Sequence, residues 1–269
     1  MTCQEADPKP GFNAGVAHPA RVYDYWLGGK DNFEADRRAG EETIAAYPLT
    51  RLSARANRAF LARTVRYLAA VEGIRQFLDI GTGLPTANNT HEVAQSVAPE
   101  SRIVYVDNDP LVLAHARALL TSGPEGATDY LDADIRDTTS ILDQAASTLD
   151  FTRPVALMLV AILHYIPDLA EVTEVLRVLT GALPPGSFVT ISHVGSDLSP
   201  EETAGLVRSM NEHLPEGNHV ARPHEVIARF FDGLDLVEPG VVQVSQWRPD
   251  TEQEAASPTI MWGGVARKR

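Results

Sequence analysis

A glycine-rich turn after an apolar segment is the first feature of this sequence that could do chemistry. Residues 77–86 read FLDIGTGLPT, and four of them stand at the end of an expected strand: Asp79, Gly81, Thr82 and Gly83. Glycines at such a turn let a ligand approach the backbone where a side chain would collide. A plain strand-to-helix turn would use the same two glycines, so this segment alone leaves both interpretations open.

Carboxylates end a second apolar segment. Residues 104–110 read VYVDNDP, and we expect Asp107, with Asn108 beside it, to accept hydrogen bonds from the hydroxyls of a ribose. Asp109 stands directly before Pro110, a residue that suits the first turn of a helix, so Asp109 is assigned to capping that helix. The alternative for Asp107 is a turn residue without a ligand.

A third loop adds another acid. Residues 130–137 read YLDADIRD, and Asp134 is placed to accept a hydrogen bond from the amino group of an adenine. Ile135 would then pack against the adenine ring. Asp137 has a simpler explanation as the cap of a following helix.

Phosphates are not the ligand that these loops favour. A dinucleotide fingerprint has a third glycine that opens a helix, but here Gly83 is followed by Leu84, Pro85 and Thr86. Asp107 also lies further from the glycines than the ~20 residues expected for that fingerprint. Three nearby acids without a phosphate-binding lysine suit a ligand with a ribose, an adenine and a positive centre.

Alternating strands and helices must position these loops. Strands are expected at residues 76–80, 102–106, 128–131, 155–161 and 187–192, with helices at 91–97, 110–120, 139–149 and 168–179. This alternation predicts parallel strands with right-handed crossovers, an α/β doubly wound sheet whose ligands bind at the carboxyl ends of the strands. After helices at 201–214 and 223–231, two late strands at 240–246 and 259–266 are expected to pair in antiparallel fashion at one edge.

The N-terminal part of the chain differs in composition and lacks the alternation of strands and helices. Residues 1–19 are expected to be a loose arm, and residues 21–33 gather Tyr23, Trp26 and other aromatic side chains before and after the glycine pair at residues 28–29. We expect a short helix that stops at these glycines, then helices at 36–46 and 53–71. The predicted division is therefore an N-terminal arm and helical lid over residues 1–72 and a ligand-binding domain over residues 73–269.

Composition excludes several classes of protein. The net charge of −13 disfavours a nucleic-acid groove, because phosphate backbones are bound by clustered lysines and arginines. Cys3 is the one cysteine, so neither an intrachain disulfide nor a four-cysteine metal site is possible. The longest apolar run, residues 154–163, is too short for a membrane span, and no secretion signal is recognisable. We expect a cytoplasmic protein without a metal ion or membrane partner, and its oligomeric state stays open.

The order Asp79-x-Gly81-x-Gly83, then Asp107, then Asp134, resembles the class I S-adenosylmethionine-dependent methyltransferases. Residues 23–33, 77–86 and 104–110 more specifically resemble a mostly actinobacterial group of S-adenosyl methyltransferases that was long known only as a domain of unknown function. The resemblance spans residues 18–269 and is close to full length.

This resemblance implies a fold and a cofactor. The fold is a Rossmann-like sheet of seven strands in the order 3-2-1-4-5-7-6, with strand 7 antiparallel and an N-terminal helical extension. The cofactor is S-adenosylmethionine. Its implied contacts come from the backbone of Gly81 to Gly83, from Asp107 at the ribose, from Asp134 and Ile135 at the adenine, and from Ala161 after the fourth strand.

The acceptor side of the transferred methyl group is implied to lie at residues 160–167. His164 is the candidate base there and Tyr165 a candidate contact. The alternative for His164 is a structural hydrogen bond to the backbone. No Asp/Asn-Pro-Pro-Tyr motif follows the fourth strand, which disfavours methylation of nucleic-acid amines, so a small-molecule acceptor with an oxygen or nitrogen nucleophile is expected.

Tyr23 and Trp26 are the aromatic residues expected to form a lid over the cofactor. Their rings would shield the sulfonium from water and attract it by cation–π contact, whereas packing in the core is the alternative. Two other functions stay open: a regulatory protein that binds S-adenosylmethionine without turnover, and, with less support, an NAD-dependent oxidoreductase.

Overall fold

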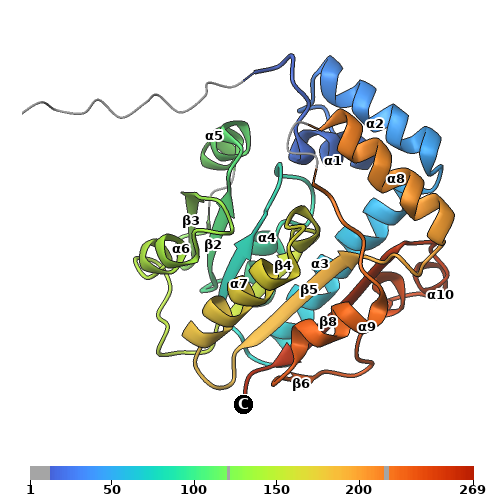
Figure 1. Ribbon diagram of the computed structural model, residues 1–269. Helices are drawn as coiled ribbons and strands as arrows, with labels where there is room; N and C mark the ends of the chain where they lie inside the picture. Colours follow the sequence, from blue (N-terminus) through green and yellow to red (C-terminus); the bar gives the residue numbers. More distant parts are fainter. Residues whose placement is uncertain (1–12, 120–121, 215–217) are drawn as a thin grey trace, which may run out of the picture.

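The computed structural model describes residues 13–119, 122–214 and 218–269 (Figure 1). Cys3 and most of the expected N-terminal arm lie outside the described residues. The same holds for Leu120, the expected end of the helix that begins at Pro110.

An eight-stranded sheet runs through the described part of the chain, in the order β3-β2-β1-β4-β5-β8-β6, with β7 paired to β8. Neighbouring strands from β3 to β5 are parallel, and β8 runs antiparallel to β5. The strands are β1 (Gln76–Ile80), β2 (Arg102–Asp107), β3 (Ala127–Asp132), β4 (Ala156–Val160), β5 (Phe188–Val194), β6 (Asp235–Leu236), β7 (Val242–Gln243) and β8 (Met261–Arg267). The predicted Rossmann-like order and the reversed seventh strand, which is β8, are confirmed.

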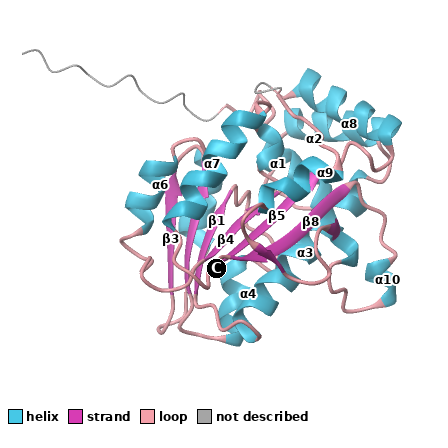
Figure 2. Ribbon diagram, turned by 60° about the horizontal axis from the view of Figure 1, so that its bottom comes forward, coloured by secondary structure: helices cyan, strands magenta, loops and turns pink. Residues whose placement is uncertain are grey.

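Helices cover both faces of this sheet (Figure 2). Both faces of the central strands are buried, and β4, which reads ALMLV, is apolar along its whole length. One face packs against α3 (Thr50–Ala70) and α4 (Thr90–Val97), and the other against α6 (Thr138–Ala145), α7 (Leu169–Ala182) and α9 (His224–Ala228). Further elements are α5 (Pro110–Leu119), α10 (Glu252–Ala255) and the 3₁₀ turns η1 (Leu163–Tyr165), η2 (Arg229–Phe231) and η3 (Val244–Gln246).

The expected strand at residues 240–246 is wrong in length. Only the two residues of β7 pair with β8, and the chain then turns into η3. Arg63 of α3 gives the physical reason, because its guanidinium donates to the carbonyl oxygens of Val244 at 2.7 Å and Trp247 at 3.0 Å. The Val244 carbonyl, which is held by this buried arginine, cannot continue the strand ladder, so β7 ends at Gln243. A separate two-residue strand, β6, pairs with the other end of β8.

Three helices gather at the end of the molecule toward which the parallel strands run: α1 (Pro19–Leu27), α2 (Glu34–Ala46) and α8 (Pro200–His213) (Figure 1). Helix α1 ends at Gly28, whose φ of 87° is left-handed, as the glycine pair predicts. Helix α3 buries Phe60 and Leu68 in the same core as Phe77 of β1. The division between residues 1–72 and 73–269 stays a prediction. Within the described residues, no helix combines the length and the apolar character needed to cross a membrane.

Candidate functional site

A cavity of about 410 Å³ lies at the carboxyl ends of the parallel strands, bounded by the loops after β1 to β4 and by helices α1 and α3. The structure brings most of the predicted site residues together on its wall: Tyr23, Asp79, Gly81, Thr82, Gly83, Asp107, Asn108, Asp134, Ile135, Ala161 and Tyr165. Trp26 and His164 do not line it.

The glycine turn gives this cavity its floor. Gly81 and Gly83 have φ values of 77° and 67°, which side chains rarely adopt. A Cβ at Gly81 would lie 2.6 Å from the Cδ1 atom of Ile162, so the packing of Ile162 also requires a glycine there. A Cβ at Gly83 would meet nothing within 4 Å, which leaves open space above the backbone.

Asp107 lies beside this turn at the end of β2. Its Oδ2 accepts a hydrogen bond from the Gly83 amide at 2.8 Å, and its Oδ1 accepts one from the Asp109 amide at 3.0 Å. Burial raises the pKa of Asp107, although these two amide donors act in the opposite direction. Each carboxylate oxygen keeps a free lone pair, so Asp107 can still accept hydrogen bonds from two ligand hydroxyls.

Asp79, at the end of β1, is the second buried acid of the cavity. Burial raises its pKa to about 6, while a hydrogen bond from the Thr90 hydroxyl to its Oδ2, 2.6 Å long, and the nearby charge of Arg58 oppose that rise. A cationic ligand group beside Asp79 would favour its ionised form.

Asp134 is more exposed than the other two acids. Arg136 binds it through the guanidinium at 3.1 Å and through the backbone amide at 2.8 Å, and the same guanidinium contacts Glu171. Ile135 lines the cavity next to Asp134 and offers an apolar surface. This pair can therefore contact both the edge and the face of a flat ring.

A chain of hydrogen bonds ties the N-terminal helices to the loop after β4. The Ala161 amide donates to the Ser192 hydroxyl at 3.0 Å, and that hydroxyl donates to Asn57 Oδ1 at 2.7 Å. Asn57 in turn donates to the Tyr23 hydroxyl at 3.0 Å, and Tyr23 donates to the carbonyl of Ala54 at 3.0 Å. Ala161 has a φ of 58°, a conformation rare for alanine that this network holds in place. The Tyr23 hydroxyl is thus held in place as both donor and acceptor, and Tyr23 lines the cavity.

The expectation that His164 is a base does not fit its place in the structure. His164 is buried behind the cavity wall beside the rings of Tyr165, His193 and His219. Burial, followed by the neighbouring His193, His219 and Arg222, holds the pKa of His164 well below its usual value. Neutral and enclosed, it has no access to an acceptor in the cavity.

Arg222 holds the loop that covers this histidine cluster. Its buried guanidinium donates to the carbonyls of Leu163, Ile166 and Pro167 and lies 2.8 Å from His193 Nε2. These bonds hold the loop that carries Tyr165, so Tyr165 keeps its place on the cavity wall. His164 packs beside His193 and His219 in this cluster.

Trp26 is likewise part of the core. Its indole donates to the Gly40 carbonyl of α2 at 3.3 Å, and its ring is buried between α1 and α2. Of the two aromatic residues expected to form a lid, only Tyr23 reaches the cavity.

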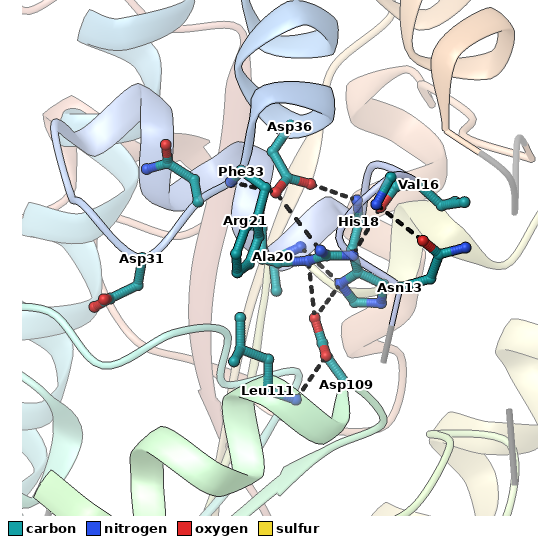
Figure 3. A network of polar contacts seen from close by, with 12 residues as sticks. Asn13, Val16, His18, Ala20, Arg21, Asp31, Phe33, Asp36, Asp109 and Leu111 are labelled. Atoms are coloured by element: carbon teal, nitrogen blue, oxygen red, sulfur yellow. Dashed lines mark hydrogen bonds and ion pairs between the residues drawn. The ribbon is translucent and has the colours of Figure 1, made fainter. Parts of the chain in front are cut away.

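A network of charges holds α1 against the carboxyl ends of the parallel strands (Figure 3). His18 Nδ1 lies 2.9 Å from Asp109 Oδ2, and Arg21 Nε lies 3.5 Å from the same oxygen. Arg21 also contacts Asp36 of α2 at 3.6 Å, and Asp36 accepts a hydrogen bond from the His18 amide. Asp109 caps α5 as predicted, through the Leu111 amide at 2.8 Å, and in addition anchors α1.

Replacing Asp109 with asparagine should loosen α1. The amide side chain keeps the cap but loses its charge opposite His18 and Arg21, so we expect the α1 amides to exchange hydrogen about tenfold faster, or ~1.4 kcal/mol. Hydrogen-exchange mass spectrometry measures this. Asp168→Asn is the matched control, because Asp168 caps α7 without a cation on it. Equal protection of α1 in both variants would show that the network does not hold the helix.

Sequence reasoning missed His18, Arg21 and Asn57. The first two stand in a segment expected to be a loose arm and its margin. The charges that they meet lie on α2 and, far away in the sequence, directly before α5. Asn57 lies within the expected helix at 53–71. The apolar spacing of that helix does not indicate that Asn57 accepts a hydrogen bond from Ser192. Arg58, the next residue of α3, also lines the cavity.

Comparison with known proteins decides the family. The family model described as S-adenosyl methyltransferase matches residues 5–269, nearly the whole chain. The chain belongs to the S-adenosyl methyltransferase family. Its methyl donor is therefore S-adenosylmethionine, and its activity is that of an S-adenosylmethionine-dependent methyltransferase. No match was found among functionally curated proteins.

Two solved structures are similar over the full length of this S-adenosyl methyltransferase. A DUF574 family protein from Streptomyces avermitilis MA-4680 is 46% identical, with a TM-score of 0.91, and the match covers 94% of this chain and 98% of the other. A candidate methyltransferase from Thermobifida fusca YX is 44% identical, with a TM-score of 0.88 and coverage of 98% and 100%. The plantazolicin methyltransferase BpumL, solved with SAH, shares the fold alone, at 12% identity, a TM-score of 0.51 and coverage of 93% and 95%.

Proposed function

We propose that this protein transfers the methyl group of S-adenosylmethionine to an oxygen or nitrogen atom of a small-molecule acceptor bound in the same cavity. The observation that carries the proposal is the convergence of Asp107, the glycine turn and the Asp134–Ile135 pair on one cavity of about 410 Å³. Ribose hydroxyls, an amino-acid tail and an adenine ring are the groups that these three features suit.

The residues present fit the cofactor. Asp107 would hold the ribose hydroxyls, Ile135 the face of the adenine and Asp134 its amino group. Above Gly83 the backbone is open, so a ligand tail can lie against it. When bound, S-adenosylmethionine supplies an electrophilic methyl group whose bond to sulfur breaks as the bond to the acceptor forms.

The chain's own contribution is positioning and exclusion of water. Tyr23 and Tyr165 line the cavity. The Tyr23 hydroxyl is fixed by the Asn57–Ser192 chain, and the backbone next to Tyr165 is fixed by Arg222. Well-oriented reactants gain ~7–11 kcal/mol from alignment alone, which reduces the need for a base. His164 is not part of this proposal, which assigns no base to the acceptor.

A labelled methyl donor tests the proposal. The protein is incubated with methyl-tritiated S-adenosylmethionine and a protein-free extract of Streptomyces avermitilis, whose own enzymes have been removed. We expect label in one small-molecule fraction, absent without the protein and strongly reduced with Asp107→Ala.

The competing function is a regulator that binds the cofactor without turnover. The position of His164 favours it, because this candidate base does not line the cavity. Tight binding of S-adenosylmethionine with no transfer of label to any fraction would support the regulator and contradict the enzyme.

A further inference from the structure

One part of the cavity wall is formed by uncharged side chains, and we call it the neutral wall. It consists of Tyr23 of α1, Leu61 of α3, Ile162 and Tyr165 from the loop after β4, and Asn218 from the chain between α8 and α9. The three acids of the site stand instead at or just after the ends of β1, β2 and β3, where the proposed cofactor contacts are. A molecule that binds beside the cofactor therefore meets the neutral wall.

The cations of the cavity are already matched by acids. Each cation that the structure describes on the cavity wall has a carboxylate near it: His18 has Asp109, Arg136 has Asp134 and Arg58 has Asp79. The first two pairs are 2.9 and 3.1 Å apart. In the third, burial raises the pKa of the acid, and the charge of the arginine opposes that rise. In a chain with a net charge of −13, this arrangement favours an uncharged acceptor over an anionic one.

Tyr165 is a firmly supported aromatic ring of the neutral wall. The ring centroids of His164 and His219 lie 4.5 and 4.4 Å from its own. Arg222 donates to the carbonyl of Ile166, the next residue, at 2.7 Å. A ring held in this way loses little conformational freedom when a ligand packs on it. A bound aromatic ring, at a centroid distance of ~4.5–7 Å, would extend the cluster of rings that already stands behind Tyr165.

Tyr23 brings a second ring to the neutral wall. Its hydroxyl is bound by Asn57 and by the carbonyl of Ala54, both at 3.0 Å, and its ring packs edge-on against Trp26 at a centroid distance of 6.2 Å. Burial raises the pKa of Tyr23, so the hydroxyl stays neutral. Two fixed rings with aliphatic side chains between the elements that carry them suit a flat apolar molecule. The amide of Asn218, which is exposed, adds a donor and an acceptor for a polar substituent.

We propose that the acceptor is an uncharged aromatic compound whose ring packs against Tyr165 and Tyr23 and whose polar substituent binds Asn218. This inference rests on the proposed function, because it takes the cofactor to lie at Asp107 and Ile135 and the acceptor to share the cavity. Tyr165 is then a specificity-determining residue, which favours an aromatic acceptor over a saturated one of the same size.

Binding of ring probes to the protein saturated with S-adenosylhomocysteine tests the inference without the natural acceptor. The probe is 2-naphthol, its saturated counterpart is decahydro-2-naphthol, and its anionic counterpart is 6-hydroxy-2-naphthoate. Ligand-observed NMR titrations give the three affinities. We expect 2-naphthol to bind about tenfold more tightly than either counterpart, because only 2-naphthol is both aromatic and uncharged.

Tyr165 variants then locate the source of this preference. Tyr165→Leu should lose most of the preference for 2-naphthol over its saturated counterpart, whereas Tyr165→Phe, which keeps the ring, should retain it. Unchanged binding of S-adenosylhomocysteine shows that each variant is folded. Tyr25→Leu is the matched control, because Tyr25 is also half-buried but does not line the cavity.

The outcomes separate the inference from the proposed function. Equal affinities of the unmodified protein for 2-naphthol and its saturated counterpart, absence of binding of 2-naphthol, or a preference that survives in Tyr165→Leu would each overturn the inference. So would an effect of Tyr165→Leu confined to S-adenosylmethionine and absent for S-adenosylhomocysteine, because the ring would then serve the positive sulfonium. If the unmodified protein binds neither S-adenosylmethionine nor S-adenosylhomocysteine, the proposed function itself fails.

Discussion

Asp107→Ala is expected to weaken the binding of S-adenosylmethionine by about 100-fold, or ~3 kcal/mol. The size follows from the loss of two hydrogen bonds to a charged group in a buried position. Asp107 is only 8% exposed, so water replaces it poorly as a partner for the ribose hydroxyls. Isothermal titration calorimetry on the folded variant gives the affinity.

Two further variants make this result interpretable. Asp107 also supports the Gly83 amide, so Asp107→Asn, which retains an acceptor oxygen there, should show a smaller loss of about tenfold. Asp143→Ala removes an exposed carboxylate on α6, away from the cavity, and should bind as the unmodified protein does. Unchanged affinity in Asp107→Ala would mean that another acid holds the ribose.

Acid is expected to destabilise the fold through the buried histidines around Arg222. Burial lowers the pKa of His193 to about 3 and that of His219 to about 4. A histidine whose folded pKa is below its unfolded value of about 6.5 binds its proton more readily in the unfolded chain. Each such group therefore costs no stability above pH 6.5 and lowers the free energy of unfolding by ~1.4 kcal/mol per pH unit below it, until its folded pKa is reached.

His219→Asn isolates one of these groups. Between pH 6.5 and pH 4 the unmodified protein should lose about 3 kcal/mol more stability than the variant, measured by urea unfolding at each pH. The difference in stability between the two proteins does not contain the contribution of Asp79, because both proteins have this residue. With its raised pKa of about 6, Asp79 stabilises the folded state as the pH falls and so opposes the effect of the histidines.

Phe230→Leu is the matched control for that difference. Phe230 packs against His193 in the same cluster but does not titrate, so its effect on stability should be equal at both ends of the range. A stability difference for His219→Asn that stays constant with pH would show that His219 does not titrate as a buried neutral group.

The residues at the strand ends were predictable because the local backbone conformation requires their residue types. Gly81 and Gly83 adopt positive φ at a turn. Asp107 is the last residue of a strand, and Asp109 stands directly before the proline that opens a helix. Such requirements can be recognised from a few neighbouring residues of the sequence. The alternation of strands and helices then brings these loops to one edge of the sheet.

The roles of His164 and of the sixth strand were not predictable, because distant residues decide them. His164 is enclosed by His193, His219 and Arg222, and no local pattern brings these together. The segment at residues 240–246 has the composition of a strand, but its Val244 carbonyl binds Arg63, far away in the sequence. Local patterns carry no information about such tertiary partners.

The most direct measurement is a crystal structure of the protein with S-adenosylhomocysteine, the demethylated form of the cofactor. We predict both ribose hydroxyls within hydrogen-bond distance of the Asp107 carboxylate and the adenine against Ile135. A nucleoside bound away from Asp107, or a cavity filled by the protein's own side chains, would contradict this account.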